Sequence, residues 1–153
     1  MDADLIPNDL DINCGRKFNM EICMGSFAEY YAEMSAGRNT EYWERNSRLM
    51  FLGYLKEYMS IYGFCYIDSK NTDICRMDVI AEISGAQYII ELRTLRGESQ
   101  VEDEIYQQFA DYLESKRKIK GYIAAFDFRH GADKQPTDKY IDIDGKTIYE
   151  IVV

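Results

Sequence analysis

The sequence predicts an α/β protein, and three observations carry this prediction. A β-branched, alternating segment folds back on itself at Ser84-Gly85, which is typical of a β-hairpin. Residues 121–128 form a continuous apolar run, as expected for a strand inside a sheet that is covered on both faces. Three further segments carry apolar residues at helical spacing. With 153 residues, 46% of them hydrophobic, the chain is long enough for one domain with a substantial core.

The N-terminal part predicts an irregular segment and two helices. Residues 1–17 contain Pro7, Gly15 and several aspartates, so we expect no regular structure there. A first helix is predicted over 18–34 and a second from Asn39 or Thr40, either of which can cap it, to Gly63. We expect residues 1–40 to form an irregular segment and a helix that packs on the main domain, and residues 41–153 to form that domain.

The hairpin about Ser84-Gly85 brings charged residues to one face. If these two residues form the loop, Asp78 lies opposite Glu91 and Arg76 lies opposite Arg93. Directly opposed residues have Cβ atoms about 5 Å apart, which is close enough for two carboxylates to share a divalent cation. The alternative is a solvated ladder of salt bridges in which both arginines neutralise both acids. The spacing alone does not separate these two readings.

A helix, a strand and a second hairpin follow. The helix is predicted to begin at Ser99 or Gln100, with an apolar side that includes Ile105 and Phe109. The apolar strand over 121–128 comes next. Residues 140–142 and 147–153 are then expected to pair about Asp144-Gly145, a strong turn signal.

An ordered set of short motifs resembles a known family. The Asp, hairpin and Glu-x-Lys pattern is the signature of the PD-(D/E)xK nuclease superfamily, and the likeness is greatest to the nuclease-type domain at the C-terminus of many bacterial AAA-ATPase-like proteins. The likeness runs from about Glu41 to the C-terminus. It rests on Phe51-Leu52, Gly63-Phe64, Arg76-Met77-Asp78, Tyr88-Ile89-Ile90-Glu91-Leu92, Arg96-Gly97-Glu98, Gln108 to Leu113, Lys120-Gly121-Tyr122, Phe126-Asp127-Phe128 and Asp144 to Tyr149.

The resemblance implies an αβββαβ core with a central mixed sheet flanked by helices, followed by a C-terminal β-hairpin. It also implies metal-assisted hydrolysis of phosphodiester bonds in nucleic acid. Asp78, Glu91 and the backbone carbonyl of Leu92 would hold Mg²⁺ or Mn²⁺, which prefer oxygen ligands. Arg93 would take part of the electrostatic role of the family's lysine.

Two more residues receive a role through the resemblance. Gln108 would position a water or a phosphate, and its alternative is a helix-surface residue bonded to a neighbour. Glu44 would act at the edge of the site, and its alternative is to complement the helix dipole and pair with Arg48.

The sequence departs from the family in two respects. Arg93 stands where the family has lysine, and a guanidinium neither loses a proton readily nor fills the space of an ammonium. The ATPase domain that usually precedes such domains is not among these 153 residues, and the resemblance implies an ATPase domain or protein as a partner. The rival hypothesis is therefore a catalytically inactive nuclease-fold interaction module that works with an ATPase partner.

The charge of the chain opposes general nucleic-acid binding. Its formal net charge is −9, so that a polyanion meets repulsion overall and any contact must be local. The dense basic run after the third helix reads first as helix C-terminal charge and second as a phosphate contact. Candidate nucleic-acid contacts are Arg76, Arg96, Lys116, Arg117 and Lys118.

The remaining composition indicates a cytoplasmic protein. The cysteines show no Cys-x-x-Cys spacing and His130 is the only histidine, which argues for reduced thiols and against structural zinc. No apolar run is long enough to span a membrane, and the N-terminus is polar and acidic, unlike a secretory signal.

Overall fold

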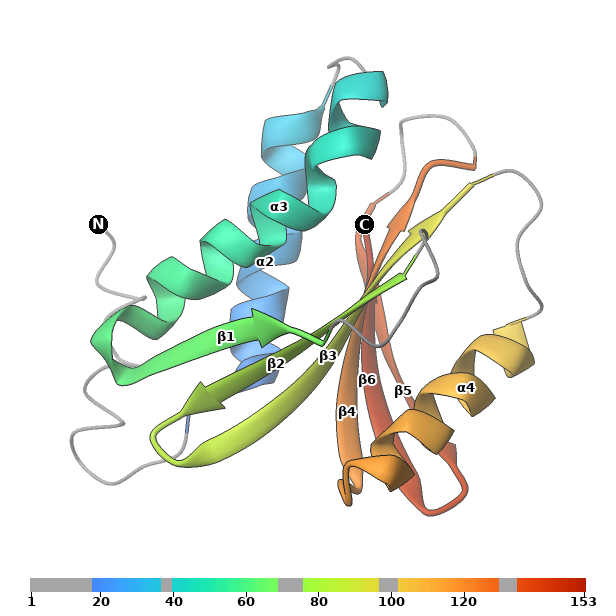
Figure 1. The fold of residues 1–153 in the computed structure, drawn as a ribbon. Coiled ribbons are helices and arrows are strands. Elements are labelled where there is room, and N and C mark those ends of the chain that lie inside the picture. The colour runs from blue at the N-terminus through green and yellow to red at the C-terminus, as the bar shows by residue number, and fades with distance from the viewer. Residues whose placement is uncertain (1–17, 37–39, 69–75, 97–101, 130–134) are drawn as a thin grey trace.

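The computed structural model describes residues 18–36, 40–68, 76–96, 102–129 and 135–153. Figure 1 shows a twisted sheet with α2 and α3 on one face and α4 on the other. The elements are α2 (Met20–Ser35), α3 (Thr40–Met59), a 3₁₀ turn (Ser60–Tyr62), β1 (Gly63–Ile67), β2 (Arg76–Ile83), β3 (Ala86–Leu95), α4 (Glu102–Ser115), β4 (Lys120–Asp127), β5 (Thr137–Ile143) and β6 (Lys146–Val152).

The sheet of the described residues is mixed, with the strand order β1-β2-β3-β4-β6-β5. The first three strands are antiparallel neighbours, β4 runs parallel to β3 and to β6, and β5 pairs antiparallel with β6. The predicted α/β fold, a mixed sheet flanked by helices, is therefore confirmed. The predicted irregular segment over residues 1–17 and the predicted start of the third helix lie outside the described residues.

Both hairpin turns form where the sequence predicts them. Ser84 and Gly85 have φ of 50° and 85°, and Asp144 and Gly145 have φ of 51° and 76°. A two-residue loop with two positive φ values matches the twist of the flanking strands. The register of each hairpin follows from its turn.

The second helix ends earlier than predicted. It stops at Met59, and Gly63 begins strand β1 after the 3₁₀ turn. Gly63 has an extended backbone, and a Cβ on it would clash with the backbone of Ile83 and the carbonyl of Glu82 on β2. Gly63 is therefore required by close strand packing and not by a helix end.

Each face of the sheet has its own core. On the α2 and α3 side, Phe27 packs edge-to-face against Phe51 and Phe126, with ring centroids 5.1 and 6.1 Å apart. On the α4 side, Phe109 packs with Ile89 and Ile123. Among the described residues, no helix is long and apolar enough to cross a membrane.

Helix α4 lies close to β4 because Gly121 has no side chain. A Cβ at this position would lie 2.6 Å from Cε2 of Phe109 and 2.8 Å from Cδ1 of Leu113. The helix ends with Arg117 at φ 59°, while the N–H of Lys118 donates to the carbonyl of Leu113 and that of Arg117 to the carbonyl of Glu114. This pattern is a Schellman motif.

Candidate functional site

The predicted pairing of charged residues on β2 and β3 is present. Asp78 faces Glu91 and Arg76 faces Arg93 across the strands. Residues two apart on a strand share a face, and Ile80 and Ile89, the pair two residues further along, pack in the core beneath α4. The four charged side chains therefore lie on the α4 side of the sheet.

These side chains are buried, which corrects one of the two readings of the sequence. Asp78 is 1% exposed, Glu91 0% and Arg93 4%, and 13% of the Arg76 side chain is exposed. A ladder of ion pairs does exist, but it is not solvated. Buried charges are tolerated only when they are paired and hydrogen-bonded, so each contact in this cluster matters more than a surface salt bridge would.

Arg76 lies between the two carboxylates. Its Nη2 is 3.6 Å from Oδ2 of Asp78, and its Nε is 2.8 Å from Oε1 of Glu91. The second distance is short, yet the N–H does not point at the oxygen, and among the described residues no group donates a hydrogen bond to Oε1 of Glu91. Arg93 holds the other oxygen well, since its Nε donates to Oε2 of Glu91 at 2.7 Å.

The formal charges of these four residues cancel, but burial still shifts the pKa of Glu91. Burial raises the pKa of Glu91, and this effect outweighs the opposing influence of Arg93 and Arg76, while Asp78 adds to the rise. Two arginines are thus sufficient to neutralise the pair but not to make the ionised form of Glu91 as favourable as it is in water.

Helix α4 contributes Gln108 to the cluster. Nη1 of Arg76 lies 3.4 Å from Oε1 of Gln108, a long hydrogen bond. The sequence placed Gln108 beside the site through the resemblance, and the structure brings it to Arg76. The alternative prediction for Gln108 is a hydrogen bond to a neighbouring residue. The contact with Arg76 fits that alternative as well, so it does not separate the two predictions.

Sequence reasoning missed Asp68, the first residue after β1. Its N–H donates to the carbonyl of Asp78 at 2.9 Å, and its Oδ2 accepts from the hydroxyl of Tyr112 at 2.6 Å. Lys116 lies 3.1 Å from the same oxygen. Burial raises the pKa of Tyr112, and its bond to Asp68 adds to this shift. Tyr112 one helical turn after Gln108 was a signal for this contact, but Asp68 carried none.

The other predicted residues lie outside the carboxylate pair. Glu44 on α3 pairs with Arg96 at 3.3 Å, a partner that the sequence did not suggest, and its role at the edge of the site stays a prediction. Lys116 pairs with Asp68, and Arg117 and Lys118 form the Schellman motif described above. The basic run therefore lies at the C-terminal end of α4, and its contact with phosphate stays a prediction.

The donor set suits a hard cation only in part. Among the described residues there is no group of three or more His, Cys, Asp or Glu side chains placed to hold a metal. Mg²⁺ commonly uses one or two carboxylates and keeps several waters, so Asp78 and Glu91 are of the right kind. The side chain of Leu92 packs in the core on the other face of the sheet. Leu92 could therefore contribute to metal binding only through its backbone carbonyl. The oxygen Oε1 of Glu91, which lacks a hydrogen bond, is the atom that an ion would satisfy.

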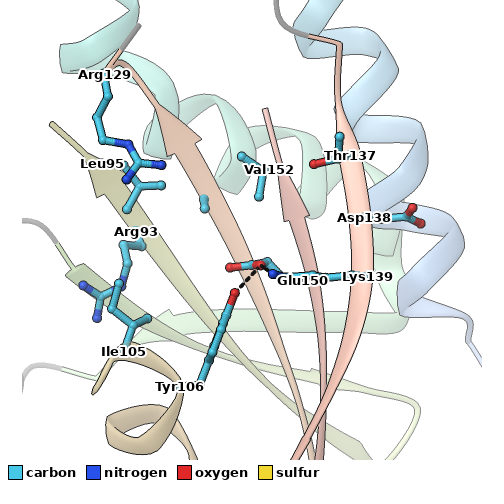
Figure 2. A pocket seen from close by; sticks show the side chains of 11 residues that line it. Arg93, Leu95, Ile105, Tyr106, Arg129, Thr137, Asp138, Lys139, Glu150 and Val152 are labelled. Carbon is cyan, nitrogen blue, oxygen red and sulfur yellow. Dashed lines mark hydrogen bonds and ion pairs between the residues drawn. The ribbon is translucent and has the colours of Figure 1, made fainter. Parts of the chain in front are cut away.

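A cavity of about 240 Å³ lies next to the carboxylate pair. Figure 2 shows the side chains that line it, with Tyr106 of α4 reaching toward Glu150 of β6. The described residues that line it are Arg93, Leu95, Ile105, Tyr106, Ala125, Arg129, Thr137, Asp138, Lys139, Glu150 and Val152. Arg93 belongs both to this wall and to the ion pair with Glu91.

Comparison with protein-family models, with curated proteins and with solved structures gave no match for this chain. The arrangement of residues is therefore the basis for any assignment of function.

Proposed function

We propose that this chain is a nuclease-like domain that hydrolyses phosphodiester bonds in nucleic acid with Mg²⁺ or Mn²⁺ at Asp78 and Glu91. The observation that carries the proposal is that these two buried carboxylates oppose each other and hold a cation, the guanidinium of Arg76, between them. The order of the elements from α3 to β4, with a hairpin after them, supports the resemblance to the PD-(D/E)xK superfamily.

The proposal requires that Arg76 yields its place. Its side chain is the most exposed of the four, so it can move toward solvent more easily than Arg93. Asp78, Glu91 and the backbone of Leu92 would then hold the ion. When bound, the ion lowers the pKa of a water molecule and offsets negative charge on the phosphate.

The residues around the pair would orient the reaction. Arg93 fixes one oxygen of Glu91 through its Nε, which leaves the other oxygen directed toward Arg76. Gln108, now bonded to Arg76, would be released to position a water or a phosphate oxygen. Asp68 holds the backbone of Asp78 through its N–H and so acts as a positioning residue.

A second function is favoured by a specific observation. Two arginines already balance the charge of the two acids, so the pair needs no metal ion to remain folded. On this reading the domain is a nuclease-fold interaction module without catalysis, which works with an ATPase partner. The replacement of the motif lysine by Arg93 is consistent with it.

Metal binding and cleavage together test the proposal. We expect calorimetry to show Mn²⁺ or Mg²⁺ binding to the wild type, and Asp78→Asn to abolish it. We expect Arg93→Lys to raise the initial rate of Mn²⁺-dependent cleavage of a panel of DNA and RNA substrates, because an ammonium fits beside the ion and the phosphate better than a guanidinium.

The double variant Arg93→Lys with Asp78→Asn is the control for contaminating nucleases. Cleavage that survives in this variant comes from another site or another protein, and contradicts the assignment of Asp78 and Glu91 as the catalytic site. If no ion binds at millimolar concentration, and Arg93→Lys loses stability without gaining activity, the interaction module is the correct reading.

A further inference from the structure

The cavity beside Arg93 is built from the carboxyl ends of parallel strands. Leu95, Ala125 and Val152 come from β3, β4 and β6, which run in parallel, and Ile105 and Tyr106 come from α4 above them. In open α/β sheets, ligands bind outside the carboxyl ends of the strands. At about 240 Å³ the cavity is several times larger than the ~30 Å³ that a water molecule occupies in the liquid.

The wall of the cavity carries more positive than negative charge. Arg93, Arg129 and Lys139 are cationic, whereas Glu150 and Asp138 are acidic. Asp138 accepts a hydrogen bond from the hydroxyl of Tyr149 at 2.8 Å. Tyr149 belongs to the core on the other face of the sheet, so the carboxylate of Asp138 is directed away from the cavity. Figure 2 shows it pointing away from the other side chains.

Glu150 is the one acid that faces inward among the described lining residues. It is 6% exposed, its Oε1 accepts from the hydroxyl of Tyr106 at 2.7 Å, and Nζ of Lys139 lies 3.9 Å from the same oxygen. Arg129 is oriented by Asp127, whose carboxylate it contacts through Nε and Nη2 at 3.0 and 3.1 Å. Each cation is therefore held in place by one acid. The acids that hold Arg93 and Arg129 do not line the cavity, whereas the two arginines do.

We infer that this cavity binds a phosphate group. A guanidinium carries five N–H donors in a planar fork, so an arginine that is bonded to a carboxylate can bind a phosphate as well. Arginine and phosphate also match in geometry, with two parallel hydrogen bonds. Arg93 lies on β3, Arg129 follows β4 and Lys139 lies on β5, so three separate segments of the chain supply the cations of the cavity.

The location of Arg93 links this cavity to the carboxylate pair. The same side chain lines the cavity and donates from Nε to Oε2 of Glu91. A phosphate in the cavity would thus lie next to the phosphodiester group that Asp78 and Glu91 are proposed to act on. That this phosphate belongs to nucleic acid rests on the proposed function, whereas the binding of phosphate itself does not.

The test is a calorimetric titration in EDTA, so that no metal-dependent step takes part. The probes are inorganic phosphate, thymidine monophosphate and a short single-stranded oligonucleotide with and without a 5′-phosphate. We expect saturable binding, and a loss of at least tenfold in affinity for Lys139→Met, whose side chain is 51% exposed and so tolerates the change. Ala125→Leu, which fills the cavity without altering charge, should have the same effect.

The matched control is Lys56→Met on the exposed side of α3, which removes an equal charge outside the cavity and should leave the affinity unchanged. Tighter binding of the oligonucleotide than of inorganic phosphate would identify nucleic acid as the source, and the reverse order would identify free phosphate. The inference is overturned if no probe binds saturably, or if Lys56→Met weakens binding as much as Lys139→Met. Absence of metal-dependent cleavage would overturn the proposed function only.

Discussion

Arg76 supplies the positive charge without which Asp78 and Glu91 would repel each other. Opposed like charges destabilise a sheet, and leaving a buried charge uncompensated costs about 3–5 kcal/mol. The guanidinium of Arg76 compensates the charge of Glu91 only in part, because it approaches Oε1 of Glu91 without a well-directed hydrogen bond. A divalent ion and Arg76 are therefore competitors for the same electrostatic position.

This competition predicts the behaviour of Arg76→Met. The variant should lose about 3–5 kcal/mol of folding free energy without metal, because two buried carboxylates lose their shared cation. It should bind Mn²⁺ more tightly than the wild type does, and Mn²⁺ should restore much of the stability by binding the folded state. Urea denaturation with and without Mn²⁺ measures both effects.

Arg45→Met is the matched control, since Arg45 is exposed and its ion pair among the described residues is an exposed contact with Glu41 at 3.9 Å. It should change stability by less than about 1 kcal/mol, and the effect of Mn²⁺ should equal that on the wild type. If Mn²⁺ fails to stabilise Arg76→Met, the carboxylate pair is an ion-pair cluster and not a metal site.

Helix α4 positions Gln108 and Tyr112, and its distance from the sheet depends on one glycine. Since a Cβ at Gly121 would meet both Phe109 and Leu113, Gly121→Ala should push the helix outward. We expect a loss of about 1–3 kcal/mol, the usual cost of overpacking, and a weakened contact of Gln108 with Arg76. Thermal denaturation checks the stability.

Gly53→Ala is the comparison within the same chain. Gly53 is exposed in α3, and nothing lies within 4 Å of a Cβ placed there, so alanine should stabilise the protein by about 0.5–1 kcal/mol. If both variants behave alike, the close contact at Gly121 does not control the packing of α4.

Elements with local signals could be predicted from the sequence, and those without could not. The turns at Ser84-Gly85 and Asp144-Gly145 carry their own backbone preference, so the pairing of Asp78 with Glu91 followed from them and is confirmed. Strand β1 is short and has Phe64 and Tyr66 exposed, so it gave no alternating pattern. In the site, the sequence placed the carboxylates and arginines together but could not decide their burial, because helix α4 covers that face from a distant part of the chain.

Asp68 shows the same limit at a single position. Its contacts with Tyr112 and Lys116 join residues far apart in sequence, and no local pattern announces them. The cavity is similar, because its wall comes from β3, β4, β5, β6 and α4 and exists only once these elements are assembled.

The whole molecule carries a formal net charge of −9, which sets the conditions for nucleic-acid binding. Long-range attraction that would gather a polyanion is lacking, and at physiological salt charges interact over only about 8 Å. Any affinity must therefore come from the carboxylate site and from the cavity beside it.

The negative net charge of the chain predicts weak, metal-dependent binding of duplex DNA. In EDTA at about 0.15 M salt, fluorescence anisotropy should detect no binding at micromolar protein concentrations. Mg²⁺ should produce binding in the wild type but not in Asp78→Asn. Strong binding in EDTA that Lys118→Gln weakens would instead show that the basic end of α4 is the contact surface.

The placement of β6 between β4 and β5 also puts the walls of the cavity on two structural units. Strands β5 and β6 form a hairpin whose own turn holds it together, and that hairpin joins the rest of the sheet through β4. Contiguous units such as this hairpin tend to open cooperatively, with free energies that range up to that of global unfolding. Lys139, Glu150 and Val152 lie on the hairpin, whereas Arg93 and Ala125 lie on the other part. We therefore expect a ligand that bridges the two walls of the cavity to slow the exchange of amide hydrogens on β6, which hydrogen-exchange measurements with and without phosphate would check.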